Sequence, residues 1–339
     1  MIPTFSRDSW ENRCQRLGVL NCKSQKTSRL SLFAVLSWVG CLLASVSGVA
    51  AAEPAWPVSV QDALRRTVTV QAAPQRIVSL TPANTEILFA LGCGDRVVGV
   101  TTFCDYPAEA KSRAKVGGFA ASTVNIESLL ALRPDLVVTG DEYHRKVVES
   151  LTKAGVPTVA IKASDFPGVF ASMITLGKLT GQSKQAEALV QAQRARVDAV
   201  VARASKIRQV DRLRVYWEVF DAPVITTGPN TIIGQLIALS GGLNVFADID
   251  SEFPQISTEA VIARDPQVIL GPKVENADSL SLEKVRARAG WKGIDAVRKG
   301  HVYAVSADLT SRPGPRLVDG LELVARTLYP ERFPAPSAP

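Results

Sequence analysis

The chain has 339 residues, enough for about two domains, and its 46% hydrophobic and 21% charged composition is typical of packed globular proteins and excludes a disordered chain. The formal charge is +7; residues 1–52 carry six bases and two acids, a net +4, which leaves +3 for the remainder. Because the remaining basic residues are scattered and form no clustered run, we expect no nucleic-acid partner.

The first 52 residues are typical of a secretory signal peptide. A basic stretch precedes an apolar run over residues 30–46, and small residues follow, with an A-x-A pattern at residues 50–52. We expect cleavage before Glu53 and export to the periplasm, although the long basic stretch leaves a later start codon open. An uncleaved membrane anchor is the alternative. A lipid anchor at Cys41 is disfavoured, because the residues around it match a lipoprotein signal poorly.

Two of the five cysteines, Cys93 and Cys104, lie outside this leader. Two thiols exclude a disulfide-dense scaffold and a cysteine-rich metal site. An oxidising compartment would permit a disulfide between them, but the sequence does not show whether they lie within bonding distance.

The first half of the body alternates strand and helix patterns. A hairpin pattern opens it, followed by short apolar runs of the kind buried on both faces of a parallel sheet, each followed by a helical pattern. Asn84 or Thr85 is the expected N-cap of the first helix. The expected strands are 58–60, 67–70, 76–80, 97–100, 136–138 and 156–161, and the expected helices start at 84 or 85 and span 126–132 and 146–154.

A long helical pattern follows, over residues 183–205, without glycine or proline and with apolar residues at helical spacing. At 1.5 Å per residue it is roughly 35 Å long, enough to span a small protein. The strand–helix alternation then restarts. We expect strands at 213–219, 224–226, 268–270 and 302–305, and helices at 232–239, 258–263 and 316–328.

Two segments of the second half repeat the first. Residues 82–88 have a counterpart at 229–233, and Glu127 precedes Pro134 by the same spacing that separates Glu259 from Pro266, each time before a strand. The repeats predict two similar α/β lobes with mostly parallel central sheets, joined by the long helix. The expected division is 1–52 leader, 57–167 first lobe, 168–207 linking helices, 208–330 second lobe and 331–339 tail.

The sequence shows no recognisable catalytic motif. The body has two histidines, His144 and His301, and no recognisable metal-ligand spacing. It contains no G-x-S-x-G nucleophile elbow and no G-x-x-x-x-G-K-[ST] phosphate loop. With export and two lobes, this favours a binding protein over an enzyme, with no intrinsic cofactor and no metal site.

Four motifs carry a resemblance to a known family. Residues 81–86 (TPANTE), 103–107 (FCDYP), 133–137 (RPDLV) and 253–259 (FPQISTE) resemble the iron-siderophore, haem and vitamin B12 class of periplasmic binding proteins, and most of all its cobalamin-binding group. The resemblance covers residues 57–330. It implies a monomer that holds a corrinoid between two lobes and delivers it to an inner-membrane ABC permease and its ATPase.

The resemblance also implies ligand-binding residues. It places the turn Pro82, Ala83 and Asn84 on the rim of the first lobe, Phe103 and Phe119 against the corrin ring, Phe253 where the family has a cleft tryptophan, and Asp308 and Arg312 as polar cleft residues. Flat apolar faces with a few polar groups suit a macrocycle with an amide rim. Core packing is the alternative for each phenylalanine, and the absence of the tryptophan weakens the cobalamin assignment.

Three further candidates follow from position. Tyr143 and His144 come after a strand, so either could reach the ligand and contact its metal, although a surface pair at a helix start is the plainer interpretation. Phe220 ends the strand of Trp217, whose alternation with Val215 and Val219 predicts a core position. Phe220 is therefore the second-lobe cleft candidate.

Two carboxylates are implied as docking groups for the permease, Glu86 on the first lobe and Glu259 on the second. Exposed charges of this kind steer encounter and fix orientation more than they add affinity. The alternative for each glutamate is a structural one, an acidic residue in the first turn of a helix, where the helix dipole stabilises negative charge. Two other functions remain: the same scaffold holding haem or a ferric siderophore, and an exported enzyme or sensor domain.

Overall fold

The computed structural model describes residues 56–274 and 279–334. The expected leader and the last residues of the expected tail lie outside the described residues. Within the described ranges, none of the helices combines the length and the apolar character that a bilayer crossing demands.

The first lobe begins with an antiparallel hairpin, β1 (Val58–Gln61) and β2 (Thr67–Val70), as the alternating pattern predicted. Five parallel strands then form one sheet in the order β5-β4-β3-β6-β7. Their bounds are β3 (Ile77–Ser79), β4 (Val97–Val100), β5 (Ala114–Lys115), β6 (Leu136–Thr139) and β7 (Thr158–Ala160).

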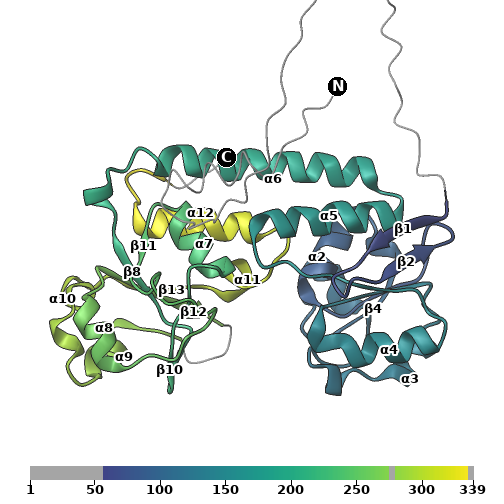
Figure 1. Cartoon of the computed structure of the whole chain (residues 1–339), viewed down its shortest axis with the longest axis horizontal. Coiled ribbons are helices and arrows are strands. Elements are labelled where there is room, and N and C mark those ends of the chain that lie inside the picture. Colours follow the sequence, from purple (N-terminus) through teal and green to yellow (C-terminus); the bar gives the residue numbers. More distant parts are fainter. Residues whose placement is uncertain (1–55, 275–278, 335–339) are drawn as a thin grey trace, which may run out of the picture. The chain divides into compact units, whose positions relative to one another are not determined.

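Helices cover both faces of this sheet, which is why its strands read as continuous apolar runs. Val78 of β3 packs with Leu129 and Leu151, which lie on α3 (Ile126–Ala131) and α4 (Arg145–Lys153). The next residue, Ser79, points the other way and accepts a hydrogen bond from Thr85 of α2 (Pro82–Ala90). Figure 1 shows α2 and the later helix α5 (Phe166–Thr180) on the side of the sheet away from α3 and α4.

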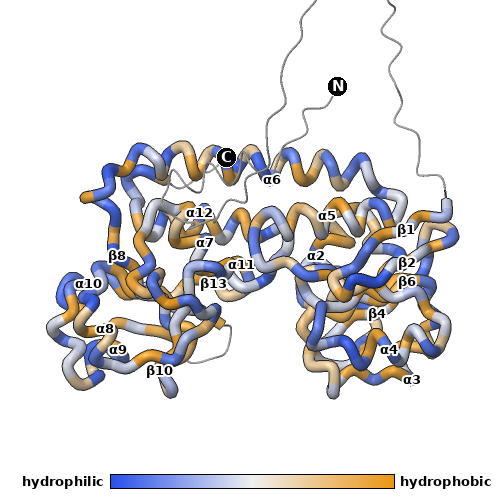
Figure 2. Tube along the Cα trace, in the orientation of Figure 1, coloured by the Kyte–Doolittle hydropathy of each residue, from blue (hydrophilic) through white to orange (hydrophobic). Residues whose placement is uncertain are grey.

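Two antiparallel helices follow the first lobe, α5 (Phe166–Thr180) and α6 (Ser183–Ala204), and they pack on each other. The long helix is continuous over the stretch that the sequence predicted. Its residues alternate between hydrophobic and hydrophilic along its length (Figure 2). Arg196 of α6 binds Asp319 and Glu322 of α12 (Leu317–Leu328) in the second lobe, with Nη2–carboxylate distances of 2.6 and 2.8 Å.

The second lobe has a four-stranded parallel sheet in the order β11-β8-β12-β13. The bounds are β8 (Arg214–Trp217), β11 (Leu243–Asn244), β12 (Val268–Lys273) and β13 (Val302–Ser306), with a short antiparallel pair, β9 (Phe220–Asp221) and β10 (Val224–Ile225), after β8. Its helices are α7 (Ile232–Leu239), α8 (Thr258–Arg264), α9 (Leu282–Ala287), α10 (Asp295–Lys299), α11 (Ala307–Thr310) and α12 (Leu317–Leu328).

Successive side chains of β8 point to opposite faces of the sheet and pack into a different core on each face. Tyr216 packs with Phe246 and Trp291 on the face covered by α8, α9 and α10. Trp217 is fully buried, as its spacing predicted. The repeated α/β alternation and the two parallel sheets therefore confirm the predicted fold class.

The two cysteines are free and buried. The thiol of Cys104 lies 3.2 Å from the hydroxyl groups of both Thr85 and Thr101, and that of Cys93 lies 3.0 Å from the guanidinium of Arg96. Each thiol is therefore held in its own polar environment, and the disulfide that the sequence left open is not formed.

Candidate functional site

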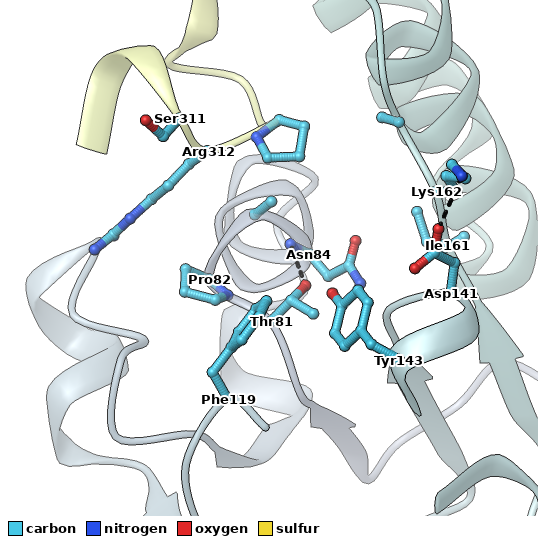
Figure 3. Close-up of a pocket in the computed structure, with 13 residues that line it drawn as sticks. Thr81, Pro82, Asn84, Phe119, Asp141, Tyr143, Ile161, Lys162, Ser311 and Arg312 are labelled. Carbon is cyan, nitrogen blue, oxygen red and sulfur yellow. Dashed lines mark hydrogen bonds and ion pairs between the residues drawn. The ribbon is translucent and has the colours of Figure 1, made fainter. Parts of the chain in front are cut away.

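A pocket of about 280 Å³ lies where the carboxyl ends of the first-lobe strands meet the segment before α12. Polar and aromatic side chains from five separate segments converge on it (Figure 3). It is lined by Thr81, Pro82, Ala83, Asn84, Phe119, Asp141, Tyr143, Ile161, Lys162, Ala163, Ser311, Arg312 and Pro313.

The start of α2 forms one rim, with the expected turn residues Pro82, Ala83 and Asn84 among the lining. The helix begins earlier than predicted, because Thr81 is the N-cap and accepts a hydrogen bond from the backbone N–H of Asn84 at 3.3 Å. Pro82 suits the first helical turn, where its missing N–H removes no helical hydrogen bond. The Asn84 side chain donates to the carbonyl of Thr139 at 3.0 Å, which fixes the rim to β6.

Two aromatic rings form another side of the pocket, and we call Phe119 and Tyr143 the aromatic wall. Their rings are stacked, with centroids 5.1 Å apart and an interplanar angle of 26°. They are 42% and 45% exposed, so both have a free face. Figure 3 shows them facing each other below Asn84. A flat apolar ligand could extend this stack.

His144 does not line the pocket and cannot contact a ligand, which corrects the expectation for this residue. Its side chain is fully buried. Nδ1 accepts a hydrogen bond from the backbone N–H of Gly140 at 2.9 Å, and Nε2 lies 2.8 Å from the carbonyl of Phe119. Neither ring nitrogen is therefore available to a metal.

The hydroxyl group of Tyr143 is in a setting that disfavours its anionic form. Burial, with a smaller contribution from the carboxylate of Asp141, raises the pKa of Tyr143 to about 12. A tyrosine that ligates ferric haem iron does so as a phenolate. Without a metal ion, the Tyr143 side chain is thus neutral at neutral pH and can stack and make neutral hydrogen bonds.

The other predicted aromatic residues are exposed but do not line this pocket. Phe103, Phe220 and Phe253 are 56%, 52% and 50% exposed. Phe103 lies in the loop after β4, close to Gly118 and so near Phe119 in the chain. Phe220 and Phe253 belong to the second lobe. The core alternative is therefore wrong for Phe103 and Phe253, and also for Phe119.

Arg312 lines the pocket from the second-lobe side, but its charge is already balanced. Its guanidinium contacts Asp105 at 2.6 Å and Asp308 at 2.7 Å, and it lies 3.5 Å from Glu86. The hydrogen bond from Arg312 lowers the pKa of the Asp105 carboxyl group. Asp308 therefore supports Arg312 and is not itself part of the lining.

Glu86 is buried, with 1% of its side chain exposed, which contradicts its expected docking role. Arg316 binds it through two hydrogen bonds of 2.9 and 2.6 Å and stacks its guanidinium on Tyr106, 3.8 Å from the ring centroid. A carboxylate enclosed in this way cannot meet a partner protein. We call Glu86 and Arg316 the interlobe pair, because they connect α2 to the segment before α12.

The repeated segments supply a pair of exposed acids instead. Glu127 lies in the first turn of α3 and Glu259 in the first turn of α8, and each follows a capping side chain, Asn125 and Ser257. Both glutamates are exposed. The first-lobe equivalent of Glu259 is therefore Glu127 and not Glu86.

Lys162 and Asp141 line the pocket and were missed by the sequence analysis. They follow β7 and β6, and Lys162 Nζ lies 3.3 Å from Asp141 Oδ2. Polar residues directly after parallel strands are the signal that could have found them, because such strand ends gather at one edge of the sheet.

The fold and this pocket define a two-lobed α/β solute-binding protein with its candidate site at the strand ends of the first lobe. The family model described as periplasmic binding protein matches residues 77–309, and the chain belongs to this family. The chain is thus a non-enzymatic, extracytoplasmic component of transport, in the class that takes up vitamin B12, haem and siderophores.

Individual relatives agree on the class and differ in ligand. The chain is 33% identical to the uncharacterized ABC transporter substrate-binding lipoprotein YvrC of Bacillus subtilis (strain 168), over 87% of this chain and 97% of that protein. It is 32% identical to a cobalamin-binding protein of Halobacterium salinarum, over 81% of this chain and 74% of that protein. The solved structure of the periplasmic heme-binding protein RhuT from Roseiflexus sp. RS-1 superposes with a TM-score of 0.68 at 26% identity, over 76% of this chain and 99% of that one.

Proposed function

We propose that the chain captures cobalamin or a related corrinoid and delivers it to an inner-membrane ABC permease and its ATPase. The observation that carries this proposal is the aromatic wall beside a pocket whose cations are already paired. A corrin is flat and apolar on its faces, and its rim carries neutral amides, so it needs stacking surfaces and a few hydrogen-bonding groups.

The charge balance of the pocket supports a ligand without several negative charges. Arg312 has Asp105 and Asp308 in direct contact, and Lys162 has Asp141. A carboxylate-rich or catecholate ligand would have to displace these pairs or lie beside their carboxylates. An amide-rimmed ligand can instead donate to the aspartates and accept from Arg312.

The metal setting supports a corrinoid over haem. Both nitrogens of His144 are bound to backbone groups, so this histidine offers no axial ligand to a haem iron. The relative named a cobalamin-binding protein, at 32% identity, points the same way. The pocket of about 280 Å³ would take part of a macrocycle, and the remainder would extend beyond its lining.

Export and partner contact complete the proposal. Residues 1–52 would be removed as a signal peptide, and the mature chain would act as a monomer divided into residues 57–167, 168–207 and 208–330, with a 331–339 tail. Glu127 and Glu259 would be the two acids that meet basic residues of the permease, one on each lobe, since both are exposed in matching helix turns.

The test is a calorimetric titration of the purified mature chain with cyanocobalamin, cobinamide and hemin, followed in parallel by absorbance. We expect heat and saturable binding with the corrinoids, and no Soret shift of hemin at equal concentration. Heat only with hemin, accompanied by a Soret shift, would make the chain a haem carrier. Loss of all three signals would contradict both ligands.

A further inference from the structure

His144 is buried directly behind the aromatic wall. It ends the short 3-10 turn Glu142–His144, and its ring centroid lies 4.5 Å from that of Tyr143 and 6.1 Å from that of Phe119. The ring therefore contacts both rings of the aromatic wall without being part of the pocket lining. Burying a titratable ring is costly unless its polar atoms have hydrogen-bond partners. Both ring nitrogens of His144 have such partners.

The hydrogen bonds of this ring define its tautomer. The backbone N–H of Gly140 can only donate, so Nδ1 accepts and carries no proton. The proton is consequently on Nε2, which donates to the carbonyl of Phe119. Burial lowers the pKa of His144, against smaller opposing contributions from the Phe119 carbonyl and Asp141, and this favours the neutral ring that the two bonds require.

The imidazole joins two loops that are separate in the sequence. Its bond with Gly140 lies within its own loop, and its bond with Phe119 crosses to the other loop. Gly140 and Tyr143 belong to the loop between β6 and α4, whereas Phe119 lies 25 residues before His144, in the loop after β5. Each loop supplies one ring of the aromatic wall. Because both loops bond to one rigid imidazole, the relative position of Phe119 and Tyr143 is set from behind.

Gly140 contributes to the same arrangement. A Cβ atom at this position would lie 2.0 Å from the hydroxyl oxygen of Tyr143 and 2.2 Å from its Cζ atom. The absence of a side chain therefore allows Tyr143 to fold back over the strand end and reach the stack with Phe119.

We infer that His144 is a positioning residue of the ligand site: its neutral ring ties the Phe119 loop to the Tyr143 loop and pre-organises the aromatic wall. This inference rests on the proposed corrinoid binding for its affinity readout. Pre-organisation raises affinity by removing the cost of ordering side chains on binding, so its loss weakens binding even though His144 never touches the ligand.

Three substitutions separate the two bonds. In His144→Asn, the side-chain oxygen can replace Nδ1 as acceptor for Gly140, and in His144→Gln, the terminal amide can replace Nε2 as donor to Phe119. His144→Leu removes both. We expect the Kd for cyanocobalamin to rise roughly tenfold in His144→Leu and less in His144→Asn and His144→Gln, with thermal unfolding monitored to confirm that each variant is folded.

A matched control and a coupling measurement distinguish positioning from general damage. His301→Gln changes the other histidine of the body, which lies outside the pocket lining, and should leave the Kd unchanged. In a Phe119→Ala background, His144→Leu should have much less effect on the Kd, because the ring that His144 positions is gone. Equal effects in both backgrounds would overturn the inference.

A readout without ligand keeps the inference testable on its own. Ring-to-ring NMR contacts between Phe119 and Tyr143 should be present in the wild-type chain and lost in a folded His144→Leu variant. If cyanocobalamin does not bind the wild-type chain, the proposed function fails while this measurement still decides the role of His144. Intact ring contacts in His144→Leu, or an unchanged Kd, would contradict it.

Discussion

The two lobes contribute differently to the candidate site. In the first lobe, Phe119 and Tyr143 stack on each other and are bound from behind through His144. In the second lobe, Phe220 and Phe253 are half exposed and line no part of the pocket. The second lobe contributes to the pocket lining through the segment of Arg312. The two lobes thus differ in how their aromatic residues are placed: those of the first lobe contact each other at the pocket, whereas Phe220 and Phe253 are exposed outside its lining.

The segment of Arg312 is held against the first lobe by the interlobe pair, and breaking this pair should give the largest effect. Glu86→Gln leaves the guanidinium of Arg316 without its buried counter-charge, and removing one partner of such a pair costs about 3 kcal/mol in the free energy of unfolding. Urea unfolding measures this difference.

Glu142→Gln is the matched control for this substitution. Its pair with Arg145 is exposed on both sides, so its loss should leave the unfolding midpoint nearly unchanged. If Glu86→Gln were as stable as this control, the interlobe pair would contribute nothing to holding the two lobes together.

Comparing one phenylalanine from each lobe tests the asymmetry directly. Phe119→Ala removes a ring that is already positioned, and we expect the Kd for cyanocobalamin to rise roughly 30-fold, about 2 kcal/mol. Phe253 lies outside the pocket lining, so for Phe253→Ala the rise should be only a few-fold. Calorimetric titration of both variants gives the ratio, and a larger effect for Phe253→Ala would reverse the roles that we assign to the lobes.

The lobes should be equivalent in one respect, their contact with the permease. Glu127→Ala and Glu259→Ala should each lower uptake several-fold in cells, because each removes one exposed acid from matching helix turns. The Kd for the ligand should stay at its wild-type value. Glu283→Ala, an exposed first-turn acid of α9, is the control and should leave uptake unchanged. Uptake that depends on Glu86 alone would restore the original docking assignment.

The smallest expected effect is a pH dependence that originates in the first lobe. Burial holds the pKa of His144 below 6.5, so the unfolded chain takes up a proton at a higher pH than the folded chain. Stability should therefore fall as the pH decreases from about 6.5 toward the lowered folded pKa. The difference in melting temperature between wild type and His144→Gln should change over this window. The other titratable groups are the same in both chains, so their contributions cancel in this difference. A constant difference would show that His144 does not titrate differently on folding.

Much of the fold was predictable because burial on both sides leaves a direct pattern in the sequence. The apolar runs of β3, β6 and β12 and the uninterrupted amphipathic stretch of α6 are set by local composition. Helix α5 was only partly anticipated, because Pro167 and Gly168 occupy its first turn and read as a loop. Proline is tolerated there, where its missing N–H costs no helical bond.

The site was less predictable, because its key contacts join distant parts of the chain. Glu86 was assigned to a docking surface from the family resemblance, but its partner Arg316, which encloses it, lies 230 residues away in the chain. The same holds for His144, since nothing in its neighbourhood in the sequence indicates the carbonyl of Phe119. The rim residues Pro82, Ala83 and Asn84 were expected from the family resemblance, and they line the pocket directly after β3, where parallel sheets present their ligand sites.

A crystal structure of the mature chain with bound cyanocobalamin tests the central claim most directly. The account predicts that one face of the corrin ring lies against Phe119 and Tyr143, with its rim amides near Asp141 and Arg312 and with His144 still bound to Gly140 and Phe119. A corrin ring that contacts only second-lobe residues, or that coordinates His144 after displacing these backbone bonds, would contradict it.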